Sequence, residues 1–334
     1  MDNLTHSLTG ALAAKIIDHS RSSPEASANL RRKIFWLMVL CANLPDIDVI
    51  AGFLGDRMFS MQHHRGLTHS LLFAPVFAAL PATAFHFIFK LKNFKALWLC
   101  SLIGILVHIC FDVITPFGTQ ILAPLSTTRY ALDWMFIVDP FFTGILALTM
   151  FLQRIATNRS RFIIFAGSAL VVAYLAAEVI NHYLAYRQVQ RALQQQGIEP
   201  APISALPQPL SIFRWKGLAQ TDERVLQAFF SVPSREDTLT FENYENAHDD
   251  FVGKALRTEE AQWYMRFARH PWIQSSQRGT FQIVEFRDLQ FTIDKAILRA
   301  VGFPERSTPF VMRFTFLPDG SVREIALDGR AIAH

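Results

Sequence analysis

Five long apolar runs in the first 185 residues limit the possible folds of this chain more than any other feature. Each run is about as long as the roughly 20 residues that an α-helix needs to cross a bilayer. Backbone groups in lipid must be satisfied within the segment, so the expected structure is helical. A shorter apolar stretch at 3–17 predicts a helix that inserts beside the others. The long runs are 34–54, 70–89, 96–116, 135–153 and 162–184.

The overall composition agrees with a membrane protein. The chain has 334 residues, of which 51% are hydrophobic and only 18% are charged; its mean hydropathy is +0.22. A soluble domain of this length is normally less apolar. The net charge is +4, but the basic residues are scattered or flank the apolar runs. No basic stripe is present, so no nucleic-acid partner is expected; the expected partner is the lipid bilayer.

The basic residues in the loops predict an orientation. One set of alternate loops carries ten Lys and Arg residues and the other set carries three. Lys and Arg concentrate in cytoplasmic loops, so the first set is expected in the cytoplasm. Residues 55–69 and 117–134, and everything after 185, then lie on the outer side. The three residues of the second set are Arg57, Arg65 and Arg129.

The chain changes character after residue 185. Residues 186–209, rich in Gln and Pro, are predicted to be a linker. Residues 210–334 have the alternation and turn signals of a small α+β domain. The whole chain is therefore predicted to be mainly α, with a membrane bundle of about five or six helices over 1–185 followed by this soluble domain. Strands are expected around 213–215, 225–230, 281–286, 291–293 and 310–316, and a helix at 243–270.

The densest group of chemically active residues is His63-His64-Arg65-Gly66-Leu67-Thr68-His69-Ser70. Three of the chain's 11 histidines fall within seven residues, and imidazoles are ligands for zinc and similar ions. His63 and His64 are adjacent and point differently, so only one of them is expected to bind a metal. The other could donate to a carboxylate or a substrate. The alternative is a polar loop with histidines by chance.

Further ligand candidates end other apolar runs. His108 and Asp112 are four residues apart, so on a helix they share one face. Their alternative is a buried histidine and a carboxylate that caps a bend. Asp46 and Asp48 follow Pro45, and one is expected to bind the metal while the other acts as a base or supports a ligand. Ionisable residues in membrane segments are costly, which favours a functional role for this set.

His6, four residues after Asp2, repeats the spacing of the pair at 108 and 112. In the predicted orientation, His6 joins the other candidates on the outer side of the membrane. Glu178 and His182 are also four apart, and we expect them to be partners near the membrane surface; a proton relay or extra ligands are the alternatives. The cysteines at 41, 100 and 110 lie in apolar stretches without a C-x-x-C motif, so no thiolate site is expected.

These motifs together resemble the YdjM family. The resemblance rests on Met1-Asp2-Asn3-Leu4-Thr5-His6, Leu44-Pro45-Asp46-Ile47-Asp48, the segment from His63 to Ser70, and His108-x-x-x-Asp112, and it covers residues 1–185. It implies a bacterial inner-membrane protein with a bound metal and hydrolase activity. A looser similarity is to the zinc-dependent phospholipase C fold. That fold ends in H-x-x-x-E, whereas this chain has Glu178 and His182 in the reverse order.

The leading hypothesis is a membrane-bound hydrolase with a divalent metal ion, zinc being the first choice. Its substrate would be a phospholipid or another lipid-linked phosphoester. The alternatives are a transporter or ion-handling protein that uses the same residues, and a scaffold without activity. The expected catalytic residues are Asp48, His63 and Arg65, with Arg65 steadying an anionic group. The expected metal ligands are His6, Asp46, His64, His69, His108 and Asp112.

Overall fold

The computed structural model describes residues 1–20, 27–49, 57–199, 202–233, 238–302, 304 and 308–332. The chain divides into two compact units. The first is built mainly from residues up to Val179 and is helical. The second begins at Ile180 and contains two antiparallel sheets. The predicted fold class, a membrane bundle followed by a small α+β domain, is confirmed.

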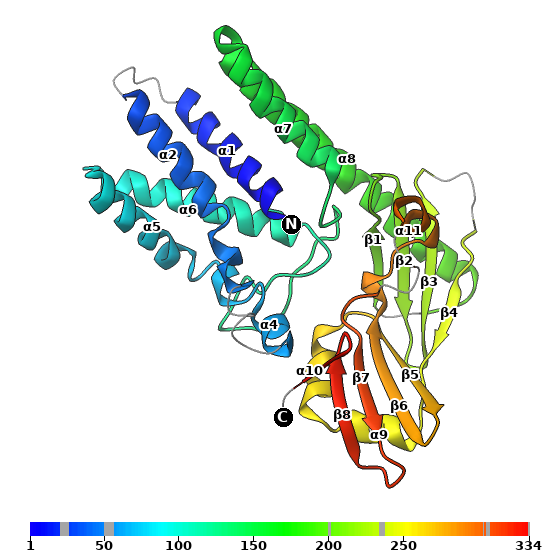
Figure 1. Cartoon of the computed structure of the whole chain (residues 1–334). Helices are drawn as coiled ribbons and strands as arrows, with labels where there is room; N and C mark the ends of the chain where they lie inside the picture. The colour runs from blue at the N-terminus through cyan, green and yellow to red at the C-terminus, as the bar shows by residue number, and fades with distance from the viewer. Residues whose placement is uncertain are drawn as a thin grey trace. The chain divides into compact units, whose positions relative to one another are not determined.

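The helical unit is centred on four helices that pack side by side (Figure 1). Their shared core consists of small and medium apolar side chains such as Ala14, Met38, Ala78 and Ile105. Asn93 begins one helix because its side chain accepts a hydrogen bond from the amide of Ala96. The four helices are α1 (Asn3–Ser20), α2 (Ala28–Cys41), α5 (Ala74–Phe89) and α6 (Phe94–Val113).

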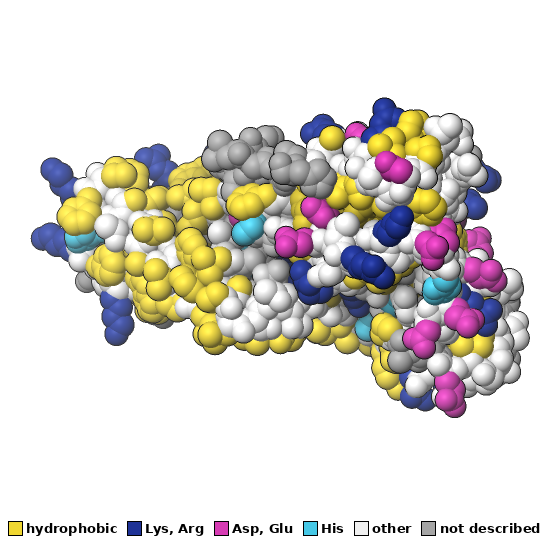
Figure 2. Space-filling view, turned by 90° about the horizontal axis from the view of Figure 1, so that it is seen from below, with side chains coloured by type: hydrophobic (Ala, Val, Ile, Leu, Met, Phe, Trp, Pro, Cys, Tyr) yellow, Lys and Arg dark blue, Asp and Glu magenta, His cyan; other side chains and the backbone are white. Residues whose placement is uncertain are grey.

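Two further helices, α7 (Pro140–Ile155) and α8 (Ser160–Gln195), complete the apolar part. Asp139 begins α7 by accepting hydrogen bonds from the amides of Phe141 and Phe142. Their core contacts include Phe142, Leu146 and Ile164. Figure 2 shows hydrophobic side chains over much of the visible face of the helical unit, as expected for a surface that contacts lipid.

By length and composition, two helices among the described residues could cross a membrane: α6 and the stretch Thr157–Gln195. A third span is possible if Met61–His69 and Ala74–Phe89, which meet at a bend of 75°, form one broken span. The α7 helix is apolar but shorter. The predicted runs at 96–116 and 162–184 therefore correspond to these two long helices.

The apolar run at 34–54 is long enough to span but does not form one continuous helix, in agreement with the interruption that Pro45 predicts. The α2 helix ends at Cys41, and the chain continues as a short 3-10 helix, η1 (Leu44–Ile47). Pro45 lies in η1 and has no amide proton for an α-helical bond. Residues 50–54 lie outside the described residues. Because α2 ends before them, Asp46 and Asp48 do not follow the α-helical spacing of its side chains.

Glycines 10, 104, 144 and 167 of the apolar runs could allow close helix contacts, and the structure shows such contacts at three of them. A Cβ atom added to Gly167 of α8 would lie 2.3 Å from side-chain atoms of Thr149 of α7. A Cβ atom added to Gly10 would lie 2.6 Å from the Cβ of Ala42, and one added to Gly104 would lie 2.8 Å from the Cβ of Cys41. The helices α1 and α6 therefore approach the end of α2 closely. At Gly144 the prediction was wrong, because no atom of the described structure lies within 4 Å of the added Cβ.

The second unit contains two antiparallel sheets with strand orders β1-β2-β3-β4 and β5-β6-β7-β8-β9. Strands β2 and β3 are joined by a tight turn at Thr221 to Arg224. The first sheet is β1 (Ile203–Pro207), β2 (Arg214–Gln220), β3 (Arg224–Ser231) and β4 (Glu242–Glu245). The second is β5 (Pro271–Arg278), β6 (Phe281–Asp288), β7 (Met312–Phe316), β8 (Val322–Leu327) and β9 (Arg330–Ala331).

Several predictions for this unit were wrong. The helix expected at 243–270 is instead β4 followed by α9 (Asp250–Ala255) and α10 (Glu259–Phe267), because Asp249 and Thr258 each begin a new helix. The strand expected at 291–293 is a 3-10 turn, η4 (Leu289–Phe291). Of the expected linker, residues up to Gln195 continue α8 and 203–207 form β1. A last helix, α11 (Lys295–Val301), was not predicted.

The ammonium-bearing side chain of Lys216 is fully buried within this unit, as is the carboxyl group of Asp288. The Lys216 ammonium donates to the backbone carbonyls of Leu289, Gln290 and Thr292 at 2.7–2.8 Å and lies 3.1 Å from the Thr292 hydroxyl. These bonds tie β2 to the turn after β6. Burial lowers the pKa of Lys216 to about 7, against the attraction of Asp288.

Candidate metal centre

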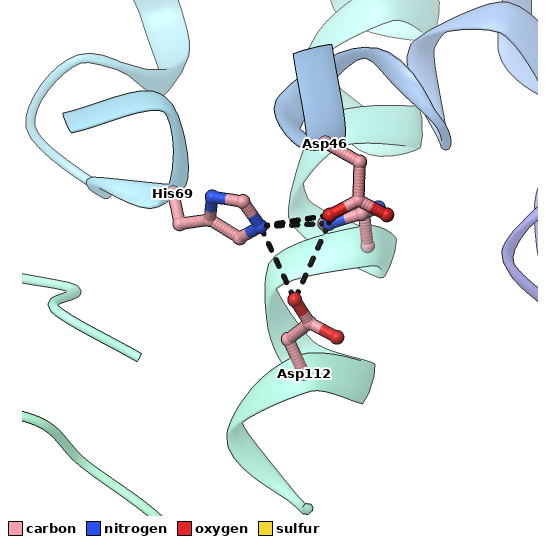
Figure 3. A group of neighbouring side chains, drawn as sticks. Asp46, His69 and Asp112 are labelled. Carbon is pink, nitrogen blue, oxygen red and sulfur yellow. Dashed lines mark hydrogen bonds and ion pairs between the residues drawn. The ribbon is translucent and has the colours of Figure 1, made fainter. Parts of the chain in front are cut away.

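Four side chains from three segments converge at one end of the helical unit. His108 and Asp112 project from the last turns of α6, Asp46 comes from η1, and His69 comes from a second short 3-10 helix, η2 (Leu67–His69). One ligand atom from each lies within 4.8 Å of the others. Figure 3 shows the side chains of Asp46, His69 and Asp112 pointing toward one another from separate elements.

The separations of these atoms fit a shared ion. The Nε2 atoms of His69 and His108 are 3.0 Å apart. Asp112 Oδ2 lies 3.2 Å and 3.4 Å from them, and Asp46 Oδ1 lies 3.5 Å from each. Ligands placed about 2.0–2.2 Å from a tetrahedral zinc ion are separated by roughly 3.3–3.6 Å. Three of the five separations lie in this range, and the other two, 3.0 and 3.2 Å, are slightly shorter. The spacing is therefore close to that of a single tetrahedral metal site.

Hydrogen bonds outside the cluster orient both imidazoles. His108 Nδ1 lies 2.7 Å from the carbonyl oxygen of Ala42, which can only accept. His69 Nδ1 lies 2.9 Å from the Thr68 hydroxyl, and that hydroxyl donates to Asp48 Oδ2. Both Nδ1 atoms are therefore donors, and in the neutral rings both Nε2 atoms carry lone pairs. Two lone pairs facing each other at 3.0 Å are repulsive unless a cation lies between them.

Buried polar atoms without partners give independent support. Among the described residues, Asp112 Oδ2 and both ring nitrogens of His6 are buried without a hydrogen bond. Each such atom costs about 1–3 kcal/mol when nothing satisfies it. The His6 ring stacks on His108 with centroids 3.8 Å apart, and its Nε2 lies 3.2 Å from Asp112 Oδ1 without hydrogen-bonding geometry. The donor set and these atoms fit a divalent cation.

Asp48 and His64 form the accessible edge of the site. His64 Nδ1 lies 3.0 Å from Asp48 Oδ1, while Asp48 Oδ2 accepts from the amide of Arg65 and from Thr68. Asp46, Asp48 and His64 also make a second group that could hold a metal. The His64 side chain is 26% exposed and that of Asp48 is 7% exposed, whereas His69 is completely buried.

Arg65 lies in the site but its guanidinium is already paired. Its Nη2 lies 3.0 Å from Asp112 Oδ1, and its Nη1 donates to Thr115 Oγ1 at 3.0 Å. The N-terminal amine of Met1 also contacts Asp112 Oδ1. The backbone of Arg65 has a φ of 58°, in the left-handed region. Its buried position indicates that it neutralises and orients Asp112, and a direct contact with an anionic group stays a prediction.

The structure does not bring His63 to the cluster. Its ring stacks on Phe59 with centroids 4.0 Å apart, and its Nδ1 lies 2.9 Å from the Phe59 carbonyl oxygen. Both contacts lie on α4 (Arg57–His63). Of the two adjacent histidines, His64 is therefore the one that faces the site.

Sequence reasoning missed the groups that orient the ligands. The Ala42 carbonyl is a backbone atom at the end of α2 and carries no sequence signal. From the sequence, either Thr68 or Ser70 could cap the helix that begins near residue 70. In the structure the Thr68 hydroxyl instead links His69 to Asp48. The position directly before a ligand histidine could have suggested this role. Arg129 was also missed; it donates to the carbonyls of Met61 and His64 and so fixes the backbone of the H-H-R-G segment.

These features define a helical membrane protein with a buried His/Asp centre that could hold a metal ion. The chain belongs to the YdjM inner membrane protein family, whose model matches residues 1–185. It is 25% identical over 142 residues to the uncharacterized protein YfhP of Bacillus subtilis, covering 42% of this chain and 40% of YfhP. It is 31% identical over 112 residues to the inner membrane protein YbcI of Escherichia coli, covering 33% of this chain and 64% of YbcI.

The chain thus spans less than two thirds of the length of either relative. No solved structure matches the chain. The family and the printed name of YbcI support a membrane location, in agreement with the apolar helices.

Proposed function

We propose that this protein is a metal-dependent hydrolase whose centre is held by Asp46, His69, His108 and Asp112. The observation that carries the proposal is the pair of Nε2 atoms 3.0 Å apart, both oriented as acceptors by their outer hydrogen bonds. A divalent ion there, with zinc the first choice, would polarise the bond to be cleaved and lower the pKa of bound water to about 7. His6 would add a fifth contact or support Asp112.

The chain supplies a proton-transfer pair beside this centre. Asp48 accepts from His64 Nδ1, which leaves Nε2 of His64 to take a proton from water or give one to the leaving group. Asp48 is itself fixed by the Arg65 amide and the Thr68 hydroxyl. This assigns His64 to proton transfer and Asp48 to orientation. In the alternative reading, both residues bind a second ion with Asp46.

The buried guanidinium of Arg65 would favour an anionic substrate at this centre. Arg65 offsets the charge of Asp112, so the metal ligands carry less net negative charge than two carboxylates alone. A phosphoester, negatively charged at neutral pH, would then meet less repulsion. We therefore favour phosphoester hydrolysis over carboxylic ester hydrolysis.

The distribution of basic residues supports a location for this activity. Ten Lys and Arg residues lie in one set of loops and three in the other. We propose that the chain lies in the bacterial inner membrane with the centre and the second unit on the periplasmic side.

Activity assays test the proposed function directly. The full chain, purified in detergent, would be freed of metal with a chelator and assayed with bis-p-nitrophenyl phosphate and p-nitrophenyl acetate. Activity on the phosphodiester that returns with added zinc or manganese, and that is lost in the Asp112→Asn variant, supports the proposal. Phosphodiester hydrolysis that is equal with and without metal contradicts it.

A further inference from the structure

The accessible edge of the metal centre is flanked by exposed apolar side chains. Ile47 and Val49, the neighbours of Asp48 in the chain, are 50% and 43% exposed. Leu67 precedes Thr68, which donates to Asp48, and is 44% exposed. Exposed apolar side chains therefore directly precede or follow Asp48 and Thr68 in the chain. We call Ile47, Val49, Leu67, Leu71, Leu72 and Leu125 the apolar rim.

One backbone hydrogen bond and one side-chain hydrogen bond hold two parts of the rim together. The amide of Leu71 donates to the carbonyl of Ile121 at 2.9 Å, and the Ser70 hydroxyl donates to the carbonyl of Ala123 at 2.5 Å. The segment after η2 and the loop that carries Leu125 therefore lie side by side. Leu125 is 81% exposed.

Along the chain, the rim continues into the exposed apolar surface of a candidate membrane helix. The helix α5 begins at Ala74, two residues after Leu72, and its Val76 and Leu80 are exposed apolar residues. Leu67 and Leu71 lie at the 75° break of the possible broken span. In a broken span or a re-entrant loop, such a break would lie within the depth of the membrane. The occupant that matches such a continuous apolar surface is a lipid.

We propose that the substrate is a membrane amphiphile, which packs its hydrocarbon chains against the apolar rim and presents its phosphoester to the Asp48–His64 edge. The inference rests on the proposed function for its chemical step. It adds the substrate class and the route, by lateral entry from the bilayer rather than from water. A water-soluble phosphoester would gain nothing from the rim, since it has no apolar part to bury there.

Photo-crosslinking tests the route without any need for activity. Benzoylphenylalanine would replace Leu67 or Leu125 in the full chain, reconstituted in vesicles of phosphatidylethanolamine and phosphatidylglycerol. Leu80 of α5 provides the positive control. Val322 of β8, with 40% exposure close to that of Leu67, provides the matched control outside the apolar unit. Phospholipid adducts at Leu67, Leu125 and Leu80 but not at Val322 are expected. Adducts at Leu80 alone, or crosslinks from the rim to a second copy of this chain, would overturn the proposal.

Kinetics test the substrate class. The Leu67→Asn and Leu125→Asn variants would be compared with the native protein on a long-chain phospholipid in vesicles and on bis-p-nitrophenyl phosphate. We expect KM for the phospholipid to rise about tenfold, with kcat and the small-substrate reaction unchanged. An equal loss on both substrates would contradict the proposal. Lipid adducts without hydrolysis of any phosphoester would support the rim as a lipid-binding surface and refute only the proposed function.

Discussion

At the residue scale, the adjacent histidines His63 and His64 lie in different surroundings. Their sequence positions are equivalent, and the sequence alone could not decide between them. The structure turns His64 toward Asp48 and His63 onto Phe59. The decision depends on the backbone of Arg65, whose positive φ ends α4 at this point. A local backbone conformation of this kind has no reliable sequence signal in a non-glycine residue.

A pair of matched variants tests this assignment. His64→Asn removes the proposed proton-transfer group and should lower kcat for phosphodiester hydrolysis by about 10²–10⁴-fold. His63→Asn, an equal change one residue away, should leave kcat near the native value. Both rates are measured on metal-loaded protein. A loss of activity in the His63 variant with an active His64 variant would reverse the assignment.

The candidate ligands could be predicted from the sequence. His69, His108, Asp46 and Asp112 were predicted from residue type, spacing and the cost of ionisable groups in apolar segments. Their convergence could not be derived that way, because it needs η1 and η2 to meet the end of α6. The atoms that orient the two imidazoles could not be predicted either. The Ala42 carbonyl is a backbone group, and Thr68 is of a residue type that is common in loops.

At the element scale, apolar periodicity and length were good predictors in the helical unit and poorer ones beyond it. The helix at α6 follows from its uninterrupted apolar run. The strand β5 was not predicted from the sequence, because the residues after Ile273 are all polar and show no apolar alternation. The turn η4 resembles a strand in sequence, but Asp288 caps it and Lys216 binds its carbonyls. Tertiary contacts of this type override local patterns.

Two glycines provide a prediction at this scale. Gly104→Ala would place a Cβ 2.8 Å from the Cβ of Cys41 and force α2 and α6 apart. We expect a loss of about 1–3 kcal/mol in stability and a lower Tm in detergent. Gly144→Ala adds the same atom where the described structure leaves space and improves helix propensity. Its Tm should not fall. Equal losses in both variants would contradict the packing described for α2 and α6.

At the scale of the whole molecule, the orientation in the membrane is a direct prediction of the loop charges. Single cysteines at Asp222 in the second unit and at Lys92 before α6 would be introduced into a chain with Cys41, Cys100 and Cys110 replaced by Ala. A membrane-impermeant maleimide should label Asp222→Cys in intact spheroplasts and Lys92→Cys only after lysis. The opposite pattern would place the second unit in the cytoplasm and refute the proposed topology.

The stability of the second unit should depend on pH through Lys216. Its pKa is about 7 when folded and about 10.4 in an unfolded chain. Between these values the unfolded chain holds a proton that the folded chain has lost, so the free energy of unfolding rises with pH. Below pH 7 both states are protonated and this contribution is constant. Urea midpoints at pH 7.5 and pH 9, followed by tryptophan fluorescence, should rise less in Lys216→Met than in the native chain. An identical rise in both would refute the assignment.

The central claim is that residues far apart in the sequence jointly hold one metal ion. The most direct test is the metal content of the purified full chain, measured for zinc, manganese and iron by plasma mass spectrometry. The account predicts a stoichiometric metal in the native protein and in His63→Ala, and its loss in both His69→Ala and His108→Ala. A native protein that contains no metal and takes up none when supplied would contradict the account.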